Sequence, residues 1–205
     1  MAPPMPFGTW SNNVIAVTSG ATRSEDKKGI WRVDAQAHPA LIAQIDTLHL
    51  EGVVTVINDV QRWGPWAGKI LTGDEDAIDV NGAPRPLIYT VDPNSAVVAN
   101  DTANLFPGAI YPEDFDMIQQ NQNLYACNPN GMIVKLSSTY LTNYVGDLLI
   151  TDAGEASPFP SLFIVHWDSA KTNFVTRRIS YVLPNGNAGA FEHVTFAPIN
   201  IPKLP

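Results

Sequence analysis

Short runs of strand-forming residues, with no helical repeat among them, are the feature that most limits how this chain can fold. The best candidate for a helix, residues 34–50, contains Pro39 and lacks a convincing 3.6-residue periodicity. Clusters of Gly, Pro, Asn and Asp separate the runs, as is typical between strands. We therefore predict an all-β fold, with strands near residues 13–18, 30–34, 40–45, 52–57, 69–73, 87–92, 96–100, 148–151, 162–167 and 174–180.

Composition indicates one globular domain and narrows its partners. The 205 residues are 45% hydrophobic, so we expect a single domain over residues 1–205. The net charge is −8 and the 12 Lys and Arg residues are scattered, which argues against a nucleic-acid partner. No apolar run is long enough to span a bilayer, and the first residues lack the pattern of a signal peptide. As written, the chain is expected to stay in the cytoplasm, unless it derives from a secreted or periplasmic parent.

Three stretches of the chain repeat one pattern. Residues 12–20, 67–75 and 145–155 share a polar or glycine start, apolar residues, a threonine and a glycine-containing turn. Each is followed by a second run that ends in aspartate and then by a weaker third run. A further element precedes the pattern at residues 50–57 and 112–118, and its third copy is the terminal segment 191–198. Repeated four-stranded antiparallel units are typical of β-propeller blades, and the chain supplies about three of them.

Aligning the repeats makes three glutamates equivalent. Glu51, Glu113 and Glu192 each stand at the start of the preceding element. Glu113 and Glu192 are as far apart in sequence as Thr72 and Thr151, so the last two repeats keep one register. The alignment predicts that the three carboxylates line one cavity on the propeller axis.

The segment "LEGV" and its two analogues resemble six-bladed propellers of the gluconolactonase, paraoxonase and calcium-dependent phosphotriesterase type. In that family a glutamate at the start of an innermost strand points at a central metal. The resemblance implies that Glu51, Glu113 and Glu192 bind a divalent cation, most simply calcium, and that the chain hydrolyses lactones, aryl esters or phosphotriesters. It covers most of the chain in architecture, but only these short motifs in residues.

Carboxylates that converge without a counter-charge raise one another's pKa or require a cation, and Ca²⁺ accepts six to eight oxygen ligands. Four neighbouring side chains offer further oxygens, namely Asn58, Asp59, Asp114 and Asp116. The simpler alternative is that the glutamates accept hydrogen bonds from backbone amides and bind no metal.

Histidine widens the choice of metal. His49 lies two residues before Glu51 and shares its face in an extended strand, so the pair offers nitrogen and oxygen to Zn²⁺ as the alternative to calcium. We expect His49 and Glu51 to be the catalytic residues, as base or nucleophile. His193, next to Glu192, is expected to point the other way.

Other candidates lie in loops. Trp63 and Trp66 stand in a Gly-Pro loop and are expected either to line a ligand pocket with Asp114 or to cap a blade. Glu75 and Glu155 recur at equivalent turns, where we expect solvated side chains at a different level from the three glutamates.

Ring closure raises a question about the last strand. Three blades are too few for a ring, and the first blade lacks an inner strand. We therefore predict that residues 193–197 pair with residues 13–18 of a second chain, giving a six-bladed homodimer by exchange of segment 191–198. The alternative is a four-bladed monomer in which residues 119–144, with a hairpin around the "NPNG" at 128–131, form an extra blade.

Two functions from different classes fit this pattern. The first is a metal-dependent hydrolase acting on a small-molecule substrate, with the cation on the propeller axis. The second is a non-catalytic propeller that binds a ligand or a protein, with at most a structural cation.

Overall fold

The computed structural model describes residues 13–18, 28–45, 49–75, 77–78, 80–83, 85–102, 104–106, 111–127, 132–152, 161–179 and 191–199. These residues form fourteen β-strands and two short α-helices, so the all-β prediction is confirmed. Every strand expected from the sequence is present, including those of the hairpin in residues 119–144. No helix among the described residues has both the length and the apolar character needed to cross a membrane.

The strands form four separate antiparallel sheets. Two have three strands, in the orders β1-β2-β3 and β10-β9-β14, and two have four, in the orders β4-β5-β6-β7 and β13-β12-β11-β8. The strands are β1 (Val14–Thr18), β2 (Gly29–Val33), β3 (Pro39–Gln44), β4 (Leu50–Thr55), β5 (Ile70–Asp74), β6 (Leu87–Val91), β7 (Val97–Asp101), β8 (Phe115–Met117), β9 (Gln122–Cys127), β10 (Ile133–Leu136), β11 (Leu148–Asp152), β12 (Ser161–Asp168), β13 (Asn173–Ile179) and β14 (His193–Pro198).

Two short helical segments connect strands. Helix α1 (Val60–Trp63) and the 3-10 turn η2 (Gly64–Trp66) lie between β4 and β5. Helix α2 (Ser138–Leu141) and the 3-10 turn η3 (Thr142–Tyr144) lie between β10 and β11. The sequence indicated a plain loop around the tryptophans, because four-residue helices leave no periodic pattern to detect.

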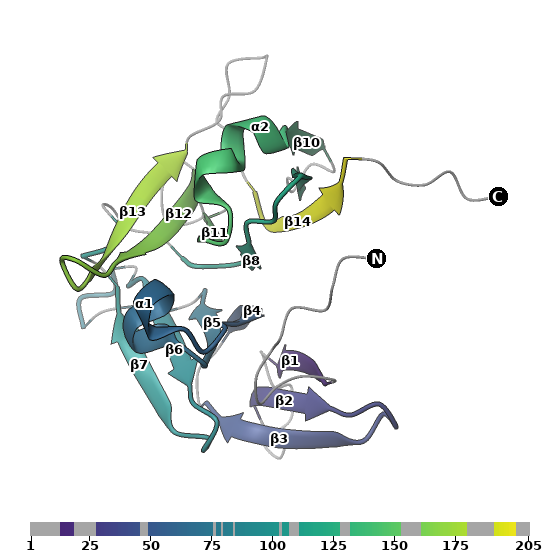
Figure 1. The fold of residues 1–205 in the computed structure, drawn as a ribbon. Helices are drawn as coiled ribbons and strands as arrows, with labels where there is room; N and C mark the ends of the chain where they lie inside the picture. Colours follow the sequence, from purple (N-terminus) through teal and green to yellow (C-terminus); the bar gives the residue numbers. More distant parts are fainter. Residues whose placement is uncertain are drawn as a thin grey trace.

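The four sheets follow one another around a centre, with β1, β4, β8 and β14 on the inner side (Figure 1). Each of these strands is the edge of its sheet, and β4 contacts β1 on one side and β8 on the other. Strand β14 in turn contacts β8. The inner strands of all four sheets are therefore linked by contacts between neighbours.

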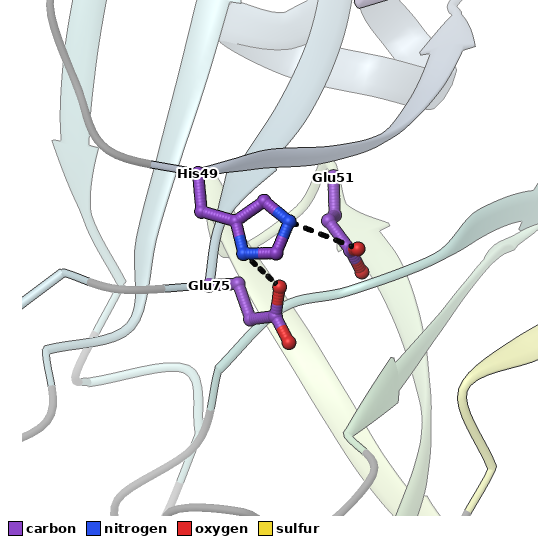
Figure 2. Close-up of side chains that lie close together, drawn as sticks. All are labelled: His49, Glu51 and Glu75. Atoms are coloured by element: carbon purple, nitrogen blue, oxygen red, sulfur yellow. Dashed lines mark ion pairs between the residues drawn. The ribbon is translucent and has the colours of Figure 1, made fainter. Parts of the chain in front are cut away.

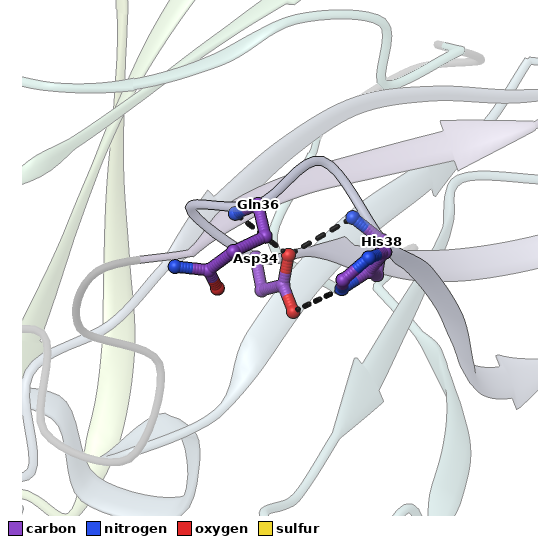
Figure 3. Close-up of polar contacts among 3 residues, drawn as sticks. All are labelled: Asp34, Gln36 and His38. Atoms are coloured by element: carbon purple, nitrogen blue, oxygen red, sulfur yellow. Dashed lines mark hydrogen bonds and ion pairs between the residues drawn. The ribbon is translucent and has the colours of Figure 1, made fainter.

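The repeat seen in the sequence corresponds to one turn used three times. Asp34 follows β2, and its Oδ1 accepts hydrogen bonds from the backbone N–H groups of Gln36 and His38, both at 2.9 Å (Figure 3). Its Oδ2 lies 3.2 Å from His38 Nδ1. Asp92 after β6 and Asp168 at the end of β12 accept backbone N–H groups of their own turns in the same way. An aspartate side chain that satisfies turn amides favours such a reversal between strands.

The aligned threonines also occupy equivalent places. Thr72 on β5 and Thr151 on β11 are buried. Thr72 Oγ1 donates to the carbonyl of Gly52 at 2.7 Å, and Thr151 Oγ1 accepts from the N–H of Asp114 at 2.9 Å. Each hydroxyl thus binds the backbone at the start of the neighbouring inner strand.

The prediction for the C-terminal strand is wrong in one respect. β14 pairs with β9 of the same chain, with Val194 opposite Ala126 and Phe196 opposite Leu124, rather than with residues 13–18. The hairpin β9–β10, which the four-bladed alternative made an extra blade, supplies the edge that β14 needs, although its 128–131 turn lies outside the described residues. Exchange of segment 191–198 is no longer needed to give β14 a partner.

Three apolar clusters fill the spaces between successive sheets. The first contains Ile30 and Ile70, the second Leu71 and Phe163, and the third Leu149 and Phe191. Trp63 and Trp66 both belong to the second cluster, with the Trp66 ring centroid 3.9 Å from that of Phe174. Both tryptophans are buried, so of the two roles expected for them the structure has the packing role.

Candidate functional site

Three ionisable side chains meet where β4 begins and β5 ends. Leu50 pairs with Asp74 across the two antiparallel strands, so the residues just outside this pair, His49 and Glu75, come side by side. Their backbones are joined by a hydrogen bond of 3.0 Å from Glu75 N to His49 O. Glu51 follows one residue into β4 and completes the cluster (Figure 2).

The imidazole of His49 contacts one carboxylate through each ring nitrogen. Its Nδ1 lies 2.5 Å from Glu75 Oε2, and its Nε2 lies 3.3 Å from Glu51 Oε1 (Figure 2). One potential ligand atom from each of the three residues lies within 4.8 Å of the others. The Glu75 side chain is only 13% exposed, while His49 and Glu51 are about one-third open to solvent, at 36% and 27%.

Gly52 explains why the chain bends directly after Glu51. Its φ is +56°, in the region that side chains disfavour, and the β4–β5 register shifts between Glu51 and Val54. A Cβ at Gly52 would collide with the carbonyl of Glu113 and the ring of Phe115. Glycine therefore lets β4 approach the start of β8 closely, and this explains the "EG" pair of the sequence motif.

Charges from two other inner strands act on Glu51. Burial raises the pKa of the Glu51 carboxyl, the charges of His49 and His193 lower it, and the Asp114 charge raises it. Burial also raises the pKa of Asp114, opposed by hydrogen bonds that its carboxylate accepts from the N–H groups of Val194 and Phe115, both at 2.8 Å. Strands β4, β8 and β14 thus bring ionisable groups into electrostatic range of one another.

The buried carboxyl of Asp116 on β8 is expected to make the free energy of unfolding depend on pH. Burial is the largest cause that raises its pKa to about 6, with a further increase from the Asp114 charge. Because the folded state then holds this proton more tightly than the unfolded state, the free energy of unfolding falls as the pH rises from about 4 to about 6. Glu51, Asp114 and Asp147 contribute in the same direction, since the pKa of each is raised.

We expect Asp116→Asn to reduce this fall by roughly 2–3 kcal/mol, as measured by urea unfolding between pH 4 and pH 7. Asp168→Asn is the control, because Lys171 lowers the pKa of that exposed carboxyl and its removal should not reduce the fall. An unchanged pH profile in Asp116→Asn would mean that Asp116 titrates normally.

The sequence-predicted residues divide into two groups. His49 and Glu51 belong to the cluster, and Asp114 acts on Glu51 electrostatically. Glu113 is buried just before β8, and Glu192 lies just before β14 with its N–H donating to Cys127 O; neither is a member of the three-residue cluster. Asn58 is exposed, and Asp59 caps α1 by accepting the Arg62 N–H at 3.2 Å.

Glu75 is the residue whose role the sequence analysis misjudged. We expected its side chain to be solvated and at a different level from the three glutamates at the strand starts, Glu51, Glu113 and Glu192 (the entry glutamates). Instead it contacts His49, which also contacts Glu51. Pairing of residue 50 with residue 74 puts position 75 opposite position 49, a consequence of register that the sequence leaves open. Glu155, its expected equivalent, lies outside the described residues.

Comparison with known proteins supplies no assignment. The chain matches no protein-family model, and neither curated proteins nor solved structures give a match.

Proposed function

We propose that this protein is a metal-dependent hydrolase whose divalent cation is held by His49 and Glu51, with Glu75 orienting His49. The observation that carries the proposal is the contact of one imidazole with two carboxylates at a partly open strand end. Packing in an apolar core would not require one histidine and two carboxylates together. A simple surface ion pair would engage one ring nitrogen of the histidine, whereas both nitrogens of His49 contact carboxylates.

The two carboxylates have different roles in this proposal. Glu75 is close to His49 Nδ1, where it can accept the N–H and fix the tautomer, as carboxylates commonly do behind metal-binding histidines. His49 Nε2 is then left as a nitrogen ligand next to the Glu51 carboxylate. The partial exposure of His49 and Glu51 leaves coordination positions for water and substrate.

The donor set favours zinc over calcium. Ca²⁺ takes oxygen ligands almost exclusively, whereas zinc and similar transition-metal ions accept imidazole nitrogen together with carboxylate oxygen. The resemblance to the propeller hydrolases suggested calcium, because the ligands expected from the sequence were the three carboxylates of Glu51, Glu113 and Glu192. With His49 in the site, the zinc alternative is the better chemical fit.

The cation would polarise a carbonyl or phosphoryl oxygen and activate a bound water. Lactones, aryl esters and phosphotriesters are the substrate classes that the resemblance of the "LEGV" segment suggests. The charge of Asp114, which acts on Glu51 from just before β8, favours a neutral substrate over an anionic one, because carboxylates repel a negative charge.

We further propose that the four sheets are blades of a β-propeller, with β1, β4, β8 and β14 around its axis. The repeated aspartate turn and the repeated threonine contact support a common blade unit. The metal site would then lie where inner strands of neighbouring blades meet.

The test is hydrolysis of a panel of lactones, aryl acetates and phosphotriesters by protein that is metal-free, loaded with Zn²⁺ or loaded with Ca²⁺. We expect turnover of at least one class with Zn²⁺, its loss on adding chelator, and its loss in His49→Ala. His38→Ala is the matched control, because His38 is an exposed histidine that also contacts a carboxylate. Inactivity across the panel in all three states would favour the non-catalytic binding module.

A further inference from the structure

An open groove with a volume of about 800 Å³ lies away from the metal site, between α1, η3 and strands β12 and β13. None of His49, Glu51 and Glu75 lines it. Its walls include Arg62 from α1 and Arg177 from β13, and its floor includes Ile164 and His166 from β12. The groove is thus separate from the chemistry proposed above.

Two arginines are held at the groove by the segment around η3. Arg62 Nη2 donates to the carbonyl of Val145 at 2.6 Å. Arg177 Nη1 donates to the hydroxyl of Tyr144, and its guanidinium carbon lies 5.3 Å from the centroid of the Tyr144 ring. The absence of a side chain at Gly146 makes room for the Arg62 guanidinium, since a Cβ there would collide with it. These contacts orient both guanidinium groups, and several N–H donors of each make no hydrogen bond to another described residue.

Neither guanidinium is neutralised by a carboxylate within ion-pair distance among the described residues. Of the acidic groups that line the groove, Asp147 contacts His166 Nδ1 at 2.9 Å and acts on Arg62 through its charge, Asp168 binds Lys171 Nζ at 2.8 Å, and Asp59 caps α1. Two oriented arginines that form no ion pair with a described carboxylate are unexpected in a chain with a net charge of −8. They are the donors that recognise carboxylate and phosphate groups.

The other side chains that line the groove favour a carboxylate over a phosphate. Trp167 and Val175 add an apolar surface beside the arginines. Asp59, Asp147 and Asp168 also line the groove, and their charges repel a dianion more than a monoanion. An apolar molecule with a single carboxylate satisfies both features, whereas inorganic phosphate satisfies neither.

We propose that this groove binds a small organic carboxylate, with its carboxylate paired to Arg62 and Arg177 and its apolar body against Trp167 and Val175. The ring of His166 is oriented by Asp147 through Nδ1, which leaves Nε2 available to the ligand. The proposal is independent of the metal-dependent activity, because the two sites share no residue.

Three probes test the proposal on the full chain by NMR titration of backbone amides: phenylacetate, the uncharged phenylacetamide, and inorganic phosphate. We expect saturable shifts with phenylacetate at residues 143–147 and 166–170, and binding about tenfold weaker or more for the other two probes. Equal binding of phenylacetamide would overturn the role of charge. Phosphate binding as tight as that of phenylacetate would overturn the carboxylate assignment, as would the absence of saturable binding by phenylacetate.

Two variants then locate the site. Arg62→Gln and Arg177→Gln should each weaken phenylacetate binding about tenfold, because each removes a charged donor pair. Arg32→Gln is the matched control, an exposed arginine on β2 outside the groove, and should bind as the unmodified chain does. Circular dichroism confirms that each variant is folded before titration. Unchanged binding in both groove variants would overturn the proposal.

Discussion

Glu51→Gln is expected to weaken Zn²⁺ binding about 100-fold or more. The amide keeps one oxygen but loses the charge that pairs with the cation, and the Glu51 carboxylate lies 3.3 Å from His49 Nε2, the nitrogen proposed as a ligand. Isothermal titration calorimetry of the metal-free protein with Zn²⁺ measures the change. Glu75→Gln should cost less, about 10- to 100-fold, because in our proposal that carboxylate orients His49.

Glu192→Gln is the matched control for this prediction. Glu192 was a metal ligand in the sequence-based prediction but is not a member of the three-residue cluster, so its replacement should change the affinity less than about threefold. If Glu192→Gln weakens binding as much as Glu51→Gln, the ring of entry glutamates is the metal site instead. Full affinity in Glu51→Gln would exclude the cluster.

Phe191→Ala is expected to lower the free energy of unfolding by about 3–5 kcal/mol. The Phe191 side chain is only 1% exposed and packs in the cluster between the sheets β13-β12-β11-β8 and β10-β9-β14, with Leu149, Ile164 and Val194. Truncating a buried phenylalanine removes apolar contact and leaves a cavity, and both effects favour unfolding. Urea unfolding, followed by far-UV circular dichroism, measures the loss.

Ile199→Ala is the control, because that side chain is 52% exposed and its truncation should cost less than about 0.5 kcal/mol. Repeating the unfolding at several protein concentrations tests where segment 191–198 packs. Pairing of β14 with β9 of its own chain predicts a midpoint independent of concentration, whereas exchange between chains predicts a midpoint that rises with concentration. A small effect of Phe191→Ala would contradict the packing itself.

The strands and the turns of this chain could largely be predicted from its sequence. The strands could be predicted because each is a short apolar or β-branched run that ends at a residue suited to turns. The turns after β2, β6 and β12 could be predicted from Asp34, Asp92 and Asp168, since an aspartate satisfies the amides of its own turn without help from distant residues. The equivalence of Thr72 and Thr151 was also visible as a repeated spacing.

Two of the three residues of the candidate site could be predicted in the same way. His49 and Glu51 are two residues apart, and an extended chain directs such side chains to the same side. Glu75 could not be predicted as their partner, because its approach to His49 depends on which residues of β4 and β5 face each other. The bulge near Gly52 alters that register, and no local rule assigns it.

The sequence by itself therefore determined the strands, their turns and the residue types available for a metal. Only the tertiary structure decided that β14 pairs with β9, that Trp63 and Trp66 are buried, and that Glu75 joins His49 and Glu51. The physical reason is that strand identity depends on neighbouring residues, whereas strand partnership depends on free energies gained between segments far apart in the chain. The edge of β9 and the apolar face formed by Leu149 and Ile164 offer β14 both hydrogen bonds and burial within its own chain.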